Sequence, residues 1–132
     1  MTTEAHFLGD ADAPPPPPGH GVLVVTFHFT SKVELYRSGM LLRDRPNWDI
    51  WVPPPVLTVD GQPVRASWST WCYPLPAGPH QVDVREPAAA GRRVEVVAGE
   101  AHRLRYDASV TIRKDHTDTR VLQWHGTGRW RA

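Results

Sequence analysis

The sequence has few of the features that cross-link, export or embed a small protein. It contains one cysteine, Cys72, in 132 residues, so no disulfide can form within the chain. Its first residues, MTTEAHFLGDADA, have no basic start and no continuous apolar run, which argues against a secretory signal. No apolar stretch approaches the roughly 20 residues that a membrane-spanning helix needs. We therefore expect a cytoplasmic protein without a membrane partner.

Neither sign of charge predominates, since the formal net charge at pH 7 is +1. Four arginines are candidates for one outward face: Arg103, Arg105, Arg113 and Arg120. Three acidic residues occupy comparable outward positions on neighbouring segments: Asp83, Glu95 and Asp107. Cross-strand ion pairs explain this pattern more simply than nucleic acid binding does. We expect no nucleic acid partner.

Motifs for catalysis, cofactor binding and metal binding are missing as well. Ser67 and Ser69 lie outside any GxSxG motif, and the glycines of 126–128 do not join a strand to a helix. The seven histidines lack zinc-site spacing. One pair, His80 and His102, could meet across a sheet, although structural roles explain them more simply. We expect a protein that is not an enzyme and that holds no cofactor and no metal.

What the sequence does contain is a two-residue hydrophobic period. In 21-GVLVVTFHFT-30, one face carries Leu23, Val25, Phe27 and Phe29. Similar segments follow at 32–38, 47–52, 56–64 (a hairpin at Asp60-Gly61), 64–69, 80–86, 92–97, 101–108, 109–114 and 119–124. No helical period persists, because proline and glycine interrupt the chain. The pattern predicts an all-β protein, an antiparallel β-sandwich formed by a single domain over residues 21–125.

The two ends of the chain differ from this pattern. Residues 1–20 are polar and finish with the prolines 14-PPPPP-18. A run of prolines favours an extended, solvated backbone, so the composition predicts a disordered proline-rich tether. The last residues, 126–132, are predicted to be frayed.

Three segments carry a family resemblance: 59-VDGQPV-64, 75-LPAGPHQVDV-84 and 91-GRRVEVVAGEAHRLRY-106. Together they make residues 56–106 similar to the PEGA-type repeat, a small module of transthyretin-like or immunoglobulin-like sandwich fold. The resemblance implies a binding or spacer domain without catalysis. The chain departs from the repeat upstream, at 21–30 and 48–55, and in the aromatic stretch 68-WSTWCYP-74.

The tryptophans suggest where such a module makes contacts. Alternation sends Trp48 and Trp68 into the core and leaves Trp51 and Trp71 on the opposite side. Three fates are open for the outward pair: a protein interface, packing under the proline loops, or stacking on a sugar ring. The candidate contact residues are Trp51, Trp71, Tyr73, Arg65 and Asp49.

We therefore predict a non-catalytic module for protein interaction or assembly, with a homo-oligomer as one possible form. A carbohydrate-binding module that uses the same aromatic side chains is the alternative. A small hydrolase is a distant third reading.

Overall fold

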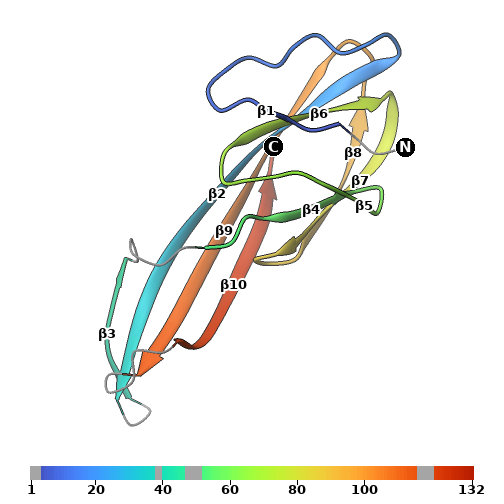
Figure 1. Cartoon of the computed structure of the whole chain (residues 1–132). Helices are drawn as coiled ribbons and strands as arrows, with labels where there is room; N and C mark the ends of the chain where they lie inside the picture. Colours follow the sequence, from blue (N-terminus) through green and yellow to red (C-terminus); the bar gives the residue numbers. More distant parts are fainter. Residues whose placement is uncertain (1–3, 38–39, 47–51, 116–120) are drawn as a thin grey trace.

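The computed structural model describes residues 4–37, 40–46, 52–115 and 121–132, and every regular element in these ranges is a β-strand (Figure 1). The all-β prediction is confirmed for this part of the chain. No helix long and apolar enough to cross a membrane occurs among these residues. The strands are β1 (His6–Phe7), β2 (His20–Arg37), β3 (Met40–Pro46), β4 (Val56–Val59), β5 (Gln62–Val64), β6 (Thr70–Pro76), β7 (Gly78–Glu86), β8 (Ala90–Val96), β9 (Ala101–Asp115) and β10 (Val121–Arg131).

The strands form two sheets. Sheet A has the order β1-β6-β2-β9-β10, with β3 beside the far half of β2, and sheet B has the order β5-β4-β7-β8. Among the described strands, every pair is antiparallel except β2 and β9, which run parallel. A parallel pair needs a long crossover connection, and here β3 to β8 supply it. The expectation of a purely antiparallel arrangement is therefore corrected at this central pair.

One hydrophobic core joins the two sheets, and we call this region the two-sheet body. Sheet A contributes side chains such as Leu23, Val25 and Tyr106, and sheet B contributes Leu57 and Val82. All five are at most 1% exposed. The alternation read from 21–30 is therefore confirmed, because its apolar face is the one that packs against sheet B.

Beyond the two-sheet body, the long strands of sheet A continue as an extension (Figure 1). We call residues 31–37, 40–46, 110–115 and 121–125 the arm. The segments 21–30 and 32–38 were expected as separate strands, as were 101–108 and 109–114. Each pair is one strand, because the parallel register between β2 and β9 runs unbroken from Val22↔Ala101 to Tyr36↔Asp115.

The N-terminal residues 4–19, which we call the strap, begin as β1 at the edge of sheet A beside β6 and then cover part of the outer side of the sheet. The strand β1 pairs with β6, and the backbone N–H of Leu8 donates to Thr70 O at 2.9 Å. The side chain of Leu8 packs on Val22, Val24 and Cys72. This arrangement differs from the expected disordered tether, because the outer side of β2 is itself apolar at its start and needs a cover.

Two other expectations concern strand ends. The Asp60-Gly61 hairpin is found as predicted between β4 and β5, with φ of +51° and +80° at its two central residues. The strand expected over 64–69 is absent, since β5 ends at Val64 and β6 begins at Thr70. The frayed end expected over 126–132 is largely strand, since β10 extends to Arg131.

Candidate functional site

The aromatic contact surface expected from the sequence is not found at Trp71 and Tyr73. Trp71 is 6% exposed and Tyr73 is fully buried, and both belong to the core between the sheets. The alternation from Trp68 to Trp71 fails because residues 65–69 are not a strand, so β6 starts a new register at Thr70. The prediction that Trp71 points outward is wrong for this reason.

The polar atoms of these two rings are used inside the protein. Trp71 donates its indole N–H to Ser67 Oγ at 2.8 Å, and Tyr73 donates its hydroxyl to Arg65 O at 2.7 Å. The exposed guanidinium of Arg65 lies over the Trp71 ring, 5.5 Å from its centroid. Burial raises the pKa of Tyr73 far above its ordinary value. The structure therefore brings three of the predicted contact residues together as a packing cluster.

The remaining aromatic predictions divide into two groups. Trp48, Asp49 and Trp51 lie outside the described residues. Trp68 packs on the core as predicted, with its ring 4.7 Å from Phe29, and its indole N–H donates to Pro53 O at 3.0 Å. Packing under the proline loop, one fate considered for the outward tryptophans, therefore applies to Trp68.

The pair His80 and His102 does not meet across a sheet, since β7 and β9 belong to different sheets. Instead His80 is held by Asp60, with Nδ1 2.6 Å from Oδ2, and by the carbonyl oxygen of Pro76, 2.7 Å from Nε2. No group of three or more metal-ligating side chains occurs in the described ranges. His80 thus serves to fix the β4–β5 turn against β7.

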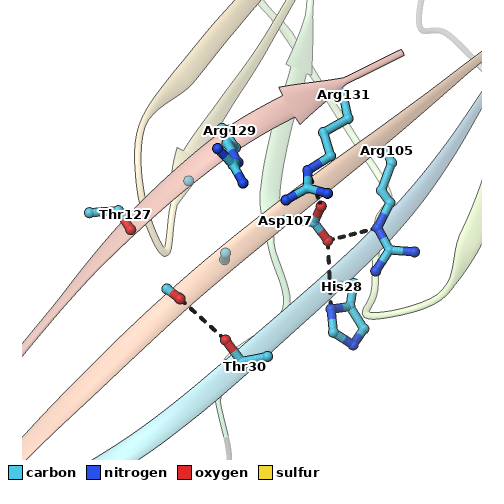
Figure 2. A pocket seen from close by; sticks show the side chains of 10 residues that line it. His28, Thr30, Arg105, Asp107, Thr127, Arg129 and Arg131 are labelled. Carbon is cyan, nitrogen blue, oxygen red and sulfur yellow. Dashed lines mark hydrogen bonds and ion pairs between the residues drawn. The ribbon is translucent and has the colours of Figure 1, made fainter.

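A different cluster of functional side chains lies on the outer side of sheet A, where β2, β9 and β10 run side by side (Figure 2). Strand alternation sends one residue in two of each strand to this side. The side chains gathered there are His28, Thr30, Arg105, Asp107, Ser109, Thr127, Arg129 and Arg131. We call this group the arginine face. It surrounds a solvent-open hollow of about 460 Å³.

Asp107 lies at the centre of the arginine face. Its Oδ1 accepts a hydrogen bond from Arg105 Nε at 2.7 Å and lies 3.6 Å from His28 Nδ1. Its Oδ2 is buried and forms an ion pair with Arg131 Nε at 3.0 Å, without a hydrogen bond to the described residues. One carboxylate thus orients two guanidinium groups and faces an imidazole (Figure 2).

Arg129 has a different position in the same face. It is exposed, and it makes no ion pair with any residue that the structure describes (Figure 2). With three arginines around the hollow and one aspartate, two positive charges remain in excess. Thr30 Oγ1 and Ser109 Oγ lie 3.2 Å apart and add hydroxyl groups at its edge. Such a surface holds negatively charged oxygen atoms through charge-assisted hydrogen bonds.

The outer side of β2 and β9 carries a second ionic cluster further along the arm. Glu34 accepts from Arg113 Nε at 3.1 Å and from the Tyr36 hydroxyl at 3.2 Å, and it lies 3.5 Å from Lys32 Nζ. Burial by itself raises the pKa of Glu34, but these hydrogen bonds and charges outweigh it and lower the pKa. This cluster is internally paired, which distinguishes it from the arginine face.

Two of the three acidic residues that the sequence suggested as cross-strand partners of the β9 arginines are not their neighbours. Asp83 lies on β7 and Glu95 on β8, both in sheet B, so neither neutralises sheet A. Only Asp107 of the three acidic residues belongs to the arginine face. The missed signal was the alternation Thr127, Arg129, Arg131 in a segment expected to be frayed.

Comparisons with protein-family models, with curated proteins and with solved structures find no match for this chain. A function is therefore inferred from the geometry and charge of the arginine face.

Proposed function

We propose that the protein is a non-catalytic interaction module that holds an acidic segment of a protein partner on the arginine face. The observation that carries this proposal is the excess of arginine around a single carboxylate on an open sheet surface. Ion pairs with Asp107 hold the guanidinium groups of Arg105 and Arg131 in fixed orientations, so their other N–H groups are already positioned to donate to a ligand. Arg129 has no such partner among the described residues and supplies the least compensated charge.

The shape of the site favours an extended ligand over a small enclosed one. The hollow opens to solvent, and its side chains come from three adjacent strands. Enclosed pockets bury most of a small ligand, whereas an open row of charges along strands suits a chain with repeated carboxylates. An acidic protein segment meets both requirements.

The PEGA-type resemblance of residues 56–106 agrees with a binding role. This stretch covers β4 to β8 and the start of β9, which includes all four strands of sheet B and β6 of sheet A. We interpret the two sheets as a β-sandwich of this general kind, used as a scaffold that presents sheet A. The sugar-binding alternative has less support, because Trp71 and Tyr73 are buried and offer no platform for stacking.

The proposal is tested by fluorescence anisotropy with a labelled poly-glutamate peptide. The variant Arg129→Ala should weaken binding by about tenfold, because a charge-assisted contact is lost without disturbing the Asp107 pairs. Binding should also weaken as salt rises.

The matched control is Arg85→Ala, which removes an exposed arginine from β7 in sheet B. It should leave the affinity unchanged. Equal losses in the two variants, or no binding of poly-glutamate at low salt, would show that the arginine face is not the site.

A further inference from the structure

The strand β10 forms the edge of sheet A, next to the arginine face. Within the described residues it pairs only with β9, in a register that extends to Arg131↔Arg105. Figure 1 shows it as the outermost of the long strands. An edge strand directs alternate N–H and C=O groups away from its neighbour, where they are available to another strand.

The outward side chains of β10 are themselves part of the arginine face. They belong to Thr127, Arg129 and Arg131. These residues alternate with Trp130, whose side chain lies on the inner side, and with Gly126 and Gly128, where an added Cβ atom would lie on the inner side. A strand added beside β10 would place its own outward side chains roughly 5 Å from these residues, which is the distance of direct cross-strand pairs. Edge and charge therefore coincide on one strand.

The inner side of the edge is closed by sheet B. Trp130 donates its indole N–H to Ala90 O at 3.0 Å, and the Tyr106 hydroxyl donates to Ala88 O at 2.7 Å. A Cβ atom added at Gly128 would collide with the Tyr106 ring. The inner side of β10 is thus closed, and an added chain pairs with the strand laterally, in the plane of sheet A, with its alternate side chains on the outer side.

Charge distinguishes between two possible occupants of this edge, a second copy of the chain and an acidic segment. A second copy of the chain paired through β10 would bring Arg129 and Arg131 of both copies onto one strip, and like charges across strands are destabilising. A segment with carboxylates at alternate positions would instead face these arginines with opposite charge.

We propose that the acidic partner binds as an added β-strand along Gly126–Arg131 of β10, with its alternate carboxylates on the arginine face. This proposal rests on the proposed function and specifies the conformation and the edge through which the partner is recognised. Backbone hydrogen bonds supply affinity in this mode, and the alternate side chains supply specificity.

The test compares three acidic peptides of about seven residues, a usual strand length, in which Glu alternates with Thr or Val. The parent peptide is unmodified. Two derivatives carry N-methyl groups on alternate amides. The first derivative is methylated on the odd-numbered amides and the second on the even-numbered amides, so that each has lost the N–H donors of one edge of the strand. Binding is measured by isothermal titration calorimetry with the full chain.

We expect one N-methylated peptide to bind as the parent does and the other to lose about tenfold or more, because only one edge of the peptide faces β10. Equal affinity of all three peptides, with sensitivity to Arg129→Ala, would overturn strand addition and leave the proposed function standing. Failure of every peptide to bind would overturn both.

Two further measurements test where the peptide binds and whether its carboxylates pair with the arginines. On binding of the parent peptide, hydrogen exchange should slow at alternate amides of Gly126–Arg131, and unchanged exchange there would contradict the proposal. The double variant Thr127→Glu/Arg129→Glu should instead prefer the same peptide with Lys in place of Glu. A variant that keeps its preference for the acidic peptide would contradict the charge pairing.

Discussion

The outer side of β2 is one continuous face, yet its two halves differ in chemistry and in cover. In the first half, Val22 and Val24 are each 2% exposed, because the strap packs on them. In the second half, His28 and Thr30 are exposed and belong to the arginine face. The comparison shows how one strand combines a surface that needs a cover for stability with a surface that stays open for contact.

The largest expected effect comes from placing the same charge on each half. Val24→Asp should destabilise the protein by about 3–5 kcal/mol or prevent folding, since it buries an unpaired carboxylate under the strap. Thr30→Asp adds its carboxylate to an exposed position near arginines and should change the free energy of unfolding by less than about 0.5 kcal/mol. Urea unfolding measures both. Similar losses of unfolding free energy in the two variants would contradict the difference between the covered and the open half.

A second test measures how firmly the strap covers the first half. Cys72 is fully buried beneath it, and burial raises the pKa of the thiol, so reaction with a thiol reagent should be slow. Leu8→Ser removes the apolar contact of the strap and should speed the reaction by about tenfold or more. Asp12→Ser, at an exposed strap position, is the control and should leave the rate unchanged. A fast reaction in the unmodified protein would contradict the cover.

The third test extends the comparison of covered and open positions to two histidine–aspartate pairs. The His80 side chain is 11% exposed and lies 2.6 Å from Asp60, whereas the His28 side chain is 52% exposed and lies 3.6 Å from Asp107. Burial by itself lowers the pKa of His80. Hydrogen bonds to Asp60 and the Pro76 carbonyl, with the charges of Asp60 and Glu95, outweigh burial and raise it.

Because the pKa of His80 is raised in the folded protein, its contribution to stability is fully present below its ordinary value of 6.5. That contribution is lost as pH rises through the raised value. For Asp60, burial raises the pKa, but hydrogen bonds from His80 and the Gln81 N–H outweigh it and lower the pKa. The contribution of Asp60 is present above its ordinary value of 3.8 and is lost as pH falls through the lowered value.

His80→Gln should therefore cost about 1 kcal/mol near pH 6 and less as the pH rises above 7, a modest figure because Asp60 is half exposed. His28→Gln, at the open position, should change the free energy of unfolding by less than about 0.5 kcal/mol. Urea unfolding as a function of pH measures both variants. A cost for His80→Gln that does not change with pH would contradict the ion pair.

The smallest effect on stability is expected at the centre of the open half. Arg129→Ala should change the free energy of unfolding by less than about 0.5 kcal/mol, since its guanidinium is exposed and makes no ion pair with the described residues. The same variant should reduce binding of an acidic peptide, as proposed above. A loss of stability as large as the loss of binding would mean that Arg129 serves the fold instead of a partner.

Local pattern was a good guide wherever it stayed within one strand. The alternation in 21–30 identified Leu23, Val25 and Phe27 as core residues, and the Asp60-Gly61 hairpin lies where its positive-φ turn requires it. The prediction failed between Trp68 and Trp71, because alternation holds only while the backbone stays extended, and residues 65–69 interrupt it. Because alternation was counted through residues 65–69, Trp71 was predicted at the surface although it lies in the core.

The candidate site was partly visible in the sequence. Arg105 and Asp107 were both placed outward on the expected strand 101–108, and that placement is consistent with the structure. The contribution of Arg129 and Arg131 is absent from the sequence prediction, because residues 126–132 were expected to be frayed where β10 in fact pairs with β9. Pairing between distant segments has no local signature, since it depends on what lies alongside.

The sequence by itself determined that this chain forms strands, where its tightest hairpin turns, and which side chains share a face of β2. These features depend on two-residue periodicity and on the φ angles that particular residues tolerate. Only the tertiary structure decided that the proline-rich start covers Val22 and Val24, and that β2 and β9 lie parallel. It also decided that Asp107 faces arginines from two strands. Contacts between segments far apart in the chain result from the packing of whole sheets, which no local pattern specifies.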